Sequence, residues 1–420
     1  MSRFSAPRGT QDILPSATPR WQFIESKIRE TCRLYGFNEI RTPTFEETEL
    51  FIKHTGESTD IVNKEMYTFT SRGGQSLTLR PEGTPGTVRA YLEHNLGANL
   101  PVAKLYYLSR IFRYERPQAG RYREHNQFGV EMIGSAEPLA DAEVISLAWQ
   151  LFKSLGLTDI ELKLNSLGGP EDRPAYRQAL REYAEPILEE LCPTCKERYD
   201  KNPLRMLDCK VPTCRELLAN APGPVDFLCA VCKEHFETLQ KYLDSLGINY
   251  TVDPRLVRGL DYYTRTVFEF QTPHLGAQNT ICGGGRYDNM IEEMGGPPTP
   301  ALGFGIGLER LLLTLEGHDI ELPGVPKPQV FVAALGTAAK EVTVKLLAEL
   351  REAGVATETD YTGRSLKAQM KLADKYDAKI VLIIGEDEVS QGVVTLRDML
   401  SKEQRQIPIK QVLSTVKDLL

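Results

Sequence analysis

Apolar residues recur along the first part of the chain with a helical period. Between residues 19 and 35 they fall at three- and four-residue steps, and Gly36 follows as a helix breaker, so a helix is expected here. Residues 37–45 then have the pattern of an extended segment. Pro43 restricts that segment to a sheet edge or an interface, because proline has no backbone N–H to donate.

Short strands and helices continue beyond this point. Strands are predicted at residues 76–79, 104–114, 127–133, 160–165, 266–272 and 301–306, and helices at residues 84–94, 141–155 and 308–315. Because strands and helices do not alternate strictly, the pattern favours an α+β core with a mainly antiparallel sheet over a doubly wound parallel sheet.

A run rich in proline and glycine, residues 321–328, predicts a linker. After it, a strand, two helices and a strand are predicted at residues 330–335, 338–353, 366–376 and 379–385, which is typical of a small α/β unit. The chain therefore divides into two predicted domains, residues 1–325 and residues 326–420.

The 420 residues carry a formal net charge of −7, which argues against a protein that coats nucleic acid without selectivity. Any RNA contact must come from placed basic patches, and this favours a selective partner. No apolar run is long enough to span a membrane, and the first residues carry no secretory or acylation signal. We therefore expect no membrane partner and a cytoplasmic location.

Two segments predict a site for a nucleotide. In Gly303-Phe-Gly-Ile-Gly-Leu-Glu-Arg310, alternate glycines would leave one strand face bare for a flat ring such as adenine, and the following helix would carry Arg310 toward a phosphate. Arg113 ends a predicted strand, and its planar fork suits an α-phosphate. The alternatives are a packed strand-to-helix corner for the first segment and a surface pair of Arg113 with Glu115 for the second.

The loop after Arg113 carries the stacking and cationic side chains that single-stranded RNA ends prefer, namely Arg121, Tyr122 and Arg123. Together these segments resemble the class II aminoacyl-tRNA synthetases: residues 36–43 resemble motif 1, the Arg113 segment motif 2, and residues 303–310 motif 3. The sequence lacks the strings of the class I enzymes and a Gly-Lys-Ser/Thr phosphate loop. Residues 7–12, 80–84, 256–263 and 283–288 resemble blocks of the histidyl-tRNA synthetases in particular.

This resemblance implies an antiparallel class II catalytic core with a helical insertion at about residues 168–250, followed by a C-terminal α/β anticodon-binding domain. The implied activity joins L-histidine to tRNA(His): ATP activates histidine as its adenylate, and histidine passes to the 3′ end of the RNA. The resemblance also implies a homodimer, with Pro43 at the two-fold interface.

The resemblance assigns histidine binding to Glu82, Gly83, Thr84, Gln127, Glu131, Tyr262, Tyr263 and Tyr287. Glu82 and Thr84 match residues that hold the α-amino group, for which a carboxylate and a hydroxyl are natural acceptors. Glu131 and the paired tyrosines match the pocket around the imidazole. Without the surrounding blocks, the tyrosines would be assigned to an apolar core and Glu131 to a solvated strand.

Arg113 and Arg258 match the catalytic arginines on opposite sides of the α-phosphate, where two guanidinium groups stabilise the charge that builds up during attack. Arg310 matches a ligand of the γ-phosphate, and Glu115 a residue near the nucleotide. Mg²⁺ is expected to accompany ATP on its outer phosphates.

The predicted insertion carries two Cys-x-x-Cys pairs. Cys192, Cys195, Cys229 and Cys232 could together form a tetrahedral thiolate site for structural Zn²⁺. Because the family requires no metal there, unliganded thiols are the alternative. Cys209 and Cys214 lie in the same region, and Cys209 belongs to a family-like stretch that need not bind anything.

Two other functions fit parts of the sequence. A synthetase-like regulatory subunit of the histidine biosynthetic transferase would bind without catalysis, but it usually lacks the Arg258 block and the C-terminal domain. A nucleotide-sensing kinase domain would need kinase motifs. In the C-terminal domain, Arg364, Lys367, Lys371 and Lys375 share a face of a predicted helix, which is expected either to contact the anticodon or to be a solvated face.

Overall fold

The computed structural model describes residues 4–56, 59–118, 120–273 and 279–420. The chain folds into two compact units, Met1–Pro323 and Gly324–Leu420, and the division falls within the run rich in proline and glycine. Among the described residues, no helix is both long and apolar enough to cross a membrane.

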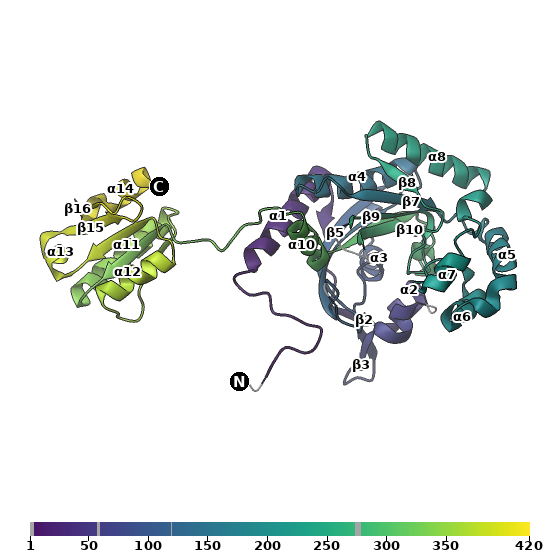
Figure 1. Ribbon diagram of the computed structural model, residues 1–420, viewed down its shortest axis with the longest axis horizontal. Coiled ribbons are helices and arrows are strands. Elements are labelled where there is room, and N and C mark those ends of the chain that lie inside the picture. The colour runs from purple at the N-terminus through teal and green to yellow at the C-terminus, as the bar shows by residue number, and fades with distance from the viewer. Residues whose placement is uncertain (1–3, 57–58, 119, 274–278) are drawn as a thin grey trace. The chain divides into compact units, whose positions relative to one another are not determined.

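An eight-stranded sheet forms the centre of the first unit (Figure 1). Its strands, in spatial order, are β1 (Asn38–Glu39), β5 (Ala103–Phe112), β6 (Glu124–Ile133), β11 (Ala301–Gly307), β10 (Thr280–Arg286), β9 (Thr264–Gln271), β7 (Glu161–Ser166) and β8 (Tyr250–Val252). Only the outer pairs β1–β5 and β7–β8 are parallel. The prediction of a mainly antiparallel α+β core is therefore confirmed.

The two faces of this sheet have different roles because side chains alternate along each strand. One face carries large apolar residues such as Phe128, Phe268 and Phe304. These pack against helices α1 (Thr18–Leu34), α4 (Pro138–Ser154), α8 (Ala230–Ser245) and α10 (Leu308–Gly317). The opposite face carries the polar and glycine positions of the same strands and is left for the site.

A buried ion pair joins the sheet to its helical layer. Arg286 of β10, which is fully buried, donates to both carboxylate oxygens of Asp141 in α4 at 2.6–2.9 Å. Its other N–H groups reach the carbonyls of Ser135 and Glu137. His235 of α8 lies 3.2 Å from the same carboxylate, so three elements meet at Asp141.

The extended segment expected at residues 37–45 is only partly a strand. β1 covers two residues, and the chain becomes a strand again at β2 (Phe45–Glu47). Between them, the guanidinium of Arg80 binds the carbonyls of Thr42 and Pro43 at 2.9 and 3.1 Å, so these groups do not enter a ladder. β2 instead joins a small sheet with β4 (Ser76–Leu79) and β3 (Tyr67–Thr70), next to α2 (Thr48–Thr55) and α3 (Thr84–Glu93).

A helical lobe lies between β7 and α8. It contains α5 (Arg173–Ala184), α6 (Pro193–Lys201), α7 (Pro212–Leu217) and the short turns η3 (Glu185–Glu190), η4 (Pro203–Met206) and η5 (Pro224–Phe227). This lobe has its own small core, whereas α8 packs into the core of the main sheet. The residues of this small core lie between Tyr176 and Phe227, within the insertion predicted at about residues 168–250.

The second unit is a five-stranded sheet in the order β13 (Thr357–Thr359), β12 (Val330–Ala334), β14 (Ile380–Ile384), β15 (Val393–Asp398) and β16 (Gln404–Pro408). Helices α11 (Thr337–Glu352) and α14 (Val412–Leu419) cover one face, α12 (Leu366–Lys375) covers the other, and α13 (Glu386–Gln391) precedes β15. The predicted strands and helices are present, and the β15–β16 hairpin is an addition that the sequence did not predict.

Candidate active site

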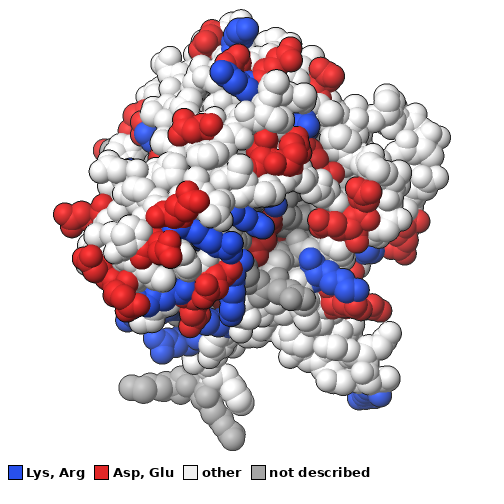
Figure 2. Space-filling view, turned by 90° about the vertical axis from the view of Figure 1, so that its right-hand side faces the viewer, with Lys and Arg blue, Asp and Glu red and all other residues white. Residues whose placement is uncertain are grey.

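A cleft of about 640 Å³ opens on the polar face of the main sheet. It is lined by the ends of β6, β9, β10 and β11, by the loop that follows β5, by the first turn of α10, by the segment before β9, and by residues 206–210 and Arg215 of the helical lobe. On the side of the molecule shown in Figure 2, Lys and Arg occur in small groups among Asp and Glu.

The structure brings the three predicted arginines into this one cleft. Arg113 donates from Nε to the carbonyl of Pro81 at 2.7 Å. Arg310, in the first turn of α10, donates to the carbonyl of Thr280 at 2.8 Å. Burial, followed by the nearby charge of Arg121, lowers the pKa of Arg310.

Arg258 is fixed by an ion pair with Glu269 of β9, which also accepts a hydrogen bond from Thr280 at 2.6 Å. The Nε of Arg258 is buried and has no hydrogen-bond partner among the described residues. Because a buried donor without a partner is costly, the guanidinium is arranged to receive an acceptor from the cleft.

The loop after β5 is held by its own charged groups. Glu115 accepts from Arg121 at 3.0 Å and lies 3.9 Å from Arg113. Arg121 and Tyr122 line the cleft. Arg123 does not: its guanidinium lies 3.8 Å from the ring centroid of Tyr114, a cation–π contact.

Glu131 of β6 is the centre of a buried polar cluster. Its carboxylate accepts hydrogen bonds from Thr84 at 2.7 Å, from Tyr107 at 3.3 Å and from the hydroxyl of Tyr287. Burial raises the pKa of Glu131 to about 8, and the charge of Glu82 acts in the same direction. Glu131 is therefore not the solvated strand carboxylate of the alternative interpretation.

A second buried carboxylate, Glu82, accepts from the hydroxyl of Thr55 and from Tyr262 at 3.0 Å. Burial raises its pKa as well. The ring of Tyr262 lies 4.7 Å from that of Tyr263 and 5.7 Å from that of Tyr287, between centroids. Gly83, next to Glu82, is the N-cap of α3. The predicted histidine-binding residues thus form one continuous group around the two carboxylates.

Gln127 lies on the same strand face as Glu131, and its side-chain oxygen is buried without a partner among the described residues. This oxygen is an acceptor that is available to a donor group of a ligand.

The glycines of β10 and β11 give space to these side chains. A Cβ at Gly303 would lie 2.1 Å from a carboxylate oxygen of Glu131, one at Gly305 2.7 Å from Gln127, and one at Gly283 2.2 Å from Arg258. The prediction that the face of β11 is bare is therefore wrong at Gly303 and Gly305. Only Gly307 leaves open space, its nearest neighbour being a side-chain atom of Arg310 at 4.0 Å.

Sequence reasoning missed several residues of the site. Tyr107 of β5 lies opposite Gly129 of β6. Its ring fills the space where Gly129 and Gly83 would otherwise carry a side chain. His125 lines the cleft, and burial together with the charge of Arg113 lowers its pKa to about 3. The sequence did contain a signal for His125: it lies two residues from Gln127, where a predicted strand begins, and residues two apart on a strand share a face. Lys210 and Arg215 had no such signal, because the lobe brings them to the cleft from a distant segment.

Comparison with known proteins agrees with this geometry. Residues 9–311 match the family described as histidyl-tRNA synthetase, and residues 329–419 match the anticodon binding domain. A histidine--tRNA ligase of Desulforamulus reducens is 53% identical over 411 residues, 98% of each chain, and one of Thermoanaerobacter pseudethanolicus is 54% identical over 414 residues, 99% of each chain. The crystal structure of apo S. aureus histidyl-tRNA synthetase has 40% identity and a TM-score of 0.84, covering 99% of this chain and 100% of that one.

The chain belongs to the histidyl-tRNA synthetase family. The predicted fold, an antiparallel class II core with a helical insertion followed by an anticodon-binding domain, is confirmed for this family member.

Among the described residues, the two Cys-x-x-Cys pairs do not share one site. Cys192 and Cys195 lie with Cys209 and Cys214, whereas Cys229 and Cys232 lie with Glu171 and Asp172. The predicted four-cysteine ligand set is therefore wrong. The physical reason is that α8, which carries the second pair, packs on the main sheet and not in the helical lobe.

Proposed function

We propose that the chain is a histidine--tRNA ligase, which activates L-histidine with ATP and transfers it to the 3′-terminal ribose of tRNA(His). The observation that carries this proposal is the contact between two kinds of site. A buried pocket of carboxylates and tyrosines adjoins a cleft with three arginines. Arg113 of the cleft donates to the carbonyl of Pro81, next to Glu82, and Arg258 and Tyr263 line one common pocket.

The pocket around Glu131 suits an imidazole. In its ionised form the carboxyl group of Glu131 accepts a ring N–H, and the hydroxyls of Tyr107 and Tyr287 keep this group fixed in one orientation. A side chain without ring nitrogens would leave these buried groups unpaired, and such a loss gives strong discrimination. Glu82 and Thr84 receive the α-amino group, and Gln127 lies beside the α-carboxylate.

Histidine binding and stability should both respond to Glu131→Gln. Because the folded carboxyl has a pKa of about 8 against 4.5 for an ordinary glutamate, the folded protein keeps a proton that the unfolded chain releases. The free energy of unfolding of the unliganded protein should therefore fall as pH rises from about 4.5 to 8. Glu131→Gln should flatten this dependence, measured by urea unfolding, and weaken histidine binding about 10–100-fold.

The control for this change is Glu161→Gln, which removes an exposed carboxylate paired with Lys163. It should leave the pH dependence and histidine affinity as they are. An unchanged pH dependence in Glu131→Gln would show that this carboxyl does not hold the extra proton.

The cleft arginines act on ATP. One oxygen of the histidine carboxylate attacks the α-phosphorus, the bond to the bridging oxygen of the β-phosphate breaks, and pyrophosphate leaves. Arg113 and Arg258 stabilise the charge on the non-bridging oxygens from two sides, and Arg310 holds the γ-phosphate. ATP carries Mg²⁺ on its outer phosphates, and the carboxylates of Glu115 and Glu269, oxygen donors of the kind Mg²⁺ prefers, line the same cleft.

In the second step a ribose hydroxyl of the RNA attacks the activated carbonyl and AMP leaves, so no covalent enzyme intermediate is needed. Arg121 and Tyr122 are placed to meet the RNA end, with Arg123 positioning the loop through Tyr114.

The C-terminal unit recognises the anticodon, and Arg364, Lys367, Lys371 and Lys375 are all exposed for it. The protein acts as a homodimer, with the exposed Pro43 in the interface.

The proposal is tested by histidine-dependent exchange of labelled pyrophosphate into ATP. The full chain should support exchange and should charge tRNA(His). A chain that ends at Pro323 keeps the whole adenylation site, so it should retain exchange and lose most RNA charging.

A regulatory subunit that only binds histidine would give no exchange although the protein is folded and binds histidine. That result would overturn the enzymatic proposal. Equal RNA charging by the full and shortened chains would overturn the role of the C-terminal unit alone.

A further inference from the structure

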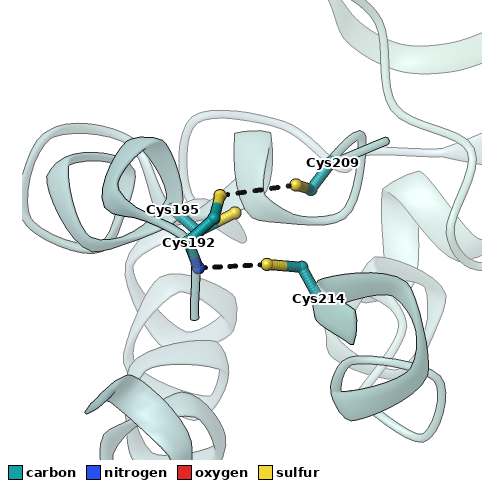
Figure 3. A group of neighbouring side chains, drawn as sticks. All are labelled: Cys192, Cys195, Cys209 and Cys214. Atoms are coloured by element: carbon teal, nitrogen blue, oxygen red, sulfur yellow. Dashed lines mark hydrogen bonds between the residues drawn. The ribbon is translucent and has the colours of Figure 1, made fainter. Parts of the chain in front are cut away.

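Four cysteines of the helical lobe converge on one point (Figure 3). Cys192 is the N-cap of α6, Cys195 lies in its first turn, Cys209 follows η4, and Cys214 lies in α7. Their sulfur atoms all lie within 4.8 Å of one another, and none forms a disulfide. Three separate segments thus deliver four free thiols to one site.

The spacing suits a tetrahedral metal ion. With Zn–S bonds of about 2.3 Å, the sulfur atoms of a tetrahedral site lie about 3.8 Å apart. The sulfur atoms of Cys192 and Cys209 are 3.8 Å apart. In addition, the backbone N–H of Cys192 donates to the sulfur of Cys214 at 3.2 Å, a contact that favours a thiolate over a thiol.

The small core and short helices of the lobe favour an additional cross-link between its segments. Its core contains nine buried apolar residues, and three of them are Cys195, Cys209 and Cys214. α6 has nine residues and α7 has six, too short to be stable without tertiary contacts. Small units of this kind commonly use a structural metal to hold segments that a small core cannot hold.

We propose that Cys192, Cys195, Cys209 and Cys214 bind one structural Zn²⁺. The four thiols release four protons on binding, so the ion and its thiolates carry a net charge of −2. All four positions are filled by protein ligands, which leaves none for a substrate, so the site is structural.

The site also connects to the active-site cleft. Residues 206–210, which include Cys209, and Arg215, next to Cys214, form the wall that the lobe contributes. Zn²⁺ therefore fixes Lys210 and Arg215 over the cleft, and its loss should loosen this wall before it affects the main sheet.

The structure explains the neighbouring cluster of Glu171, Asp172, Cys229 and Cys232 without a metal ion. The Asp172 carboxylate accepts from the backbone N–H groups of Gly169 and Cys229 at 2.9 and 2.7 Å, so it is already used in holding the chain at the start of α8. Cys229 and Cys232 therefore provide a matched pair of thiols outside the proposed site.

The first test is elemental analysis of the full chain, purified without a tag or chelator. About one Zn²⁺ per chain is expected, and less than about a tenth would overturn the proposal. After exchange of zinc for cobalt, the same protein should show the sulfur-to-metal charge-transfer bands of a tetrahedral thiolate site. Absence of these bands, or a disulfide between Cys192 and Cys209 detected by mass spectrometry, would also overturn it.

Cysteine-to-serine variants of the two clusters should show which cysteines bind the zinc ion. Cys209→Ser and Cys214→Ser should each lose most of the zinc and become more sensitive to proteolysis within residues 176–227. The double variant Cys229→Ser/Cys232→Ser should keep its zinc. Zinc retained in both single variants, or lost in the double variant, would show that the ligands are other residues.

Discussion

An Arg258→Ala variant is expected to lose about 10³-fold in the rate of histidine-dependent pyrophosphate exchange, the effect of removing a charged group that acts in the transition state. Arg258 lines the cleft, is positioned by Glu269, and has a buried Nε without a hydrogen-bond partner among the described residues. Histidine binding, measured by calorimetry, should change little because Glu131 and Glu82 lie in the adjoining pocket. Arg258→Lys should recover only part of the rate, because an ammonium lacks the planar fork.

Removing Arg258 also leaves the Glu269 carboxylate without its ion-pair partner, and this change could itself lower the rate of pyrophosphate exchange. The double variant Arg258→Ala/Glu269→Gln removes that negative charge and should remain defective; recovery in the double variant would assign the loss to repulsion of ATP by Glu269. Arg110→Ala is the matched control, since this arginine is 65% exposed in its side chain, pairs with Glu124 and lies outside the cleft. Near-normal exchange in Arg258→Ala would show that its assigned role is wrong.

The second large effect concerns stability. Asp141→Asn should lower the free energy of unfolding by about 3–5 kcal/mol, because it removes the carboxylate that accepts three hydrogen bonds from the fully buried Arg286 and leaves this arginine with Asp288, at 3.2 Å, as its countercharge. The charge of Arg286, with His235 nearby, lowers the pKa of Asp141 to about 2 despite its burial. The stabilisation is thus complete above the usual pKa of an aspartate, 3.8, and is lost as pH falls through about 2.

The measurement is urea or thermal unfolding of the two proteins at neutral pH. Glu316→Gln is the control: it breaks an ion pair with Arg20 of similar length, 2.7 Å, but both side chains are 46% exposed. Its effect should stay below about 1 kcal/mol, as for other surface pairs. Equal effects of the two changes would contradict the importance of burial at Asp141.

The active-site blocks were accessible to sequence reasoning because each role requires a particular residue type at a particular spacing. Arg113 and Arg310 were selected for phosphate chemistry and Arg258 by its match to a block of the family, and the structure places all three in one cleft. The linker was also predictable, since proline and glycine over residues 321–328 can continue neither a helix nor a strand.

The sequence left two interpretations of the glycines open, a bare face for a flat ring and a packed corner, and the structure supports packing at Gly303 and Gly305. Alternation in the sequence showed that Gly303, Gly305 and Gly307 share one face, but not which side chains lie across from them. The antiparallel register of β6 and β11 sets Glu131 opposite Gly303, so the glycine makes room for a carboxylate rather than a nucleotide.

The cysteines show the same limit. The Cys-x-x-Cys spacing correctly grouped Cys192 with Cys195, because a helix start brings such residues together. It could not choose the remaining two ligands, since these depend on whether a later helix packs in the lobe or on the main sheet.

By itself, the sequence determined the class of core, the linker, the family and the residue types of the site, because these depend on periodicity and on local chemical requirements. Only the tertiary structure decided that Tyr107 and His125 join the site, that Arg286 and Asp141 form a buried pair, and that Cys209 and Cys214 complete the cysteine cluster. These contacts join segments far apart in the chain. Strand register and helix packing fix them, and neither can be computed from local spacing.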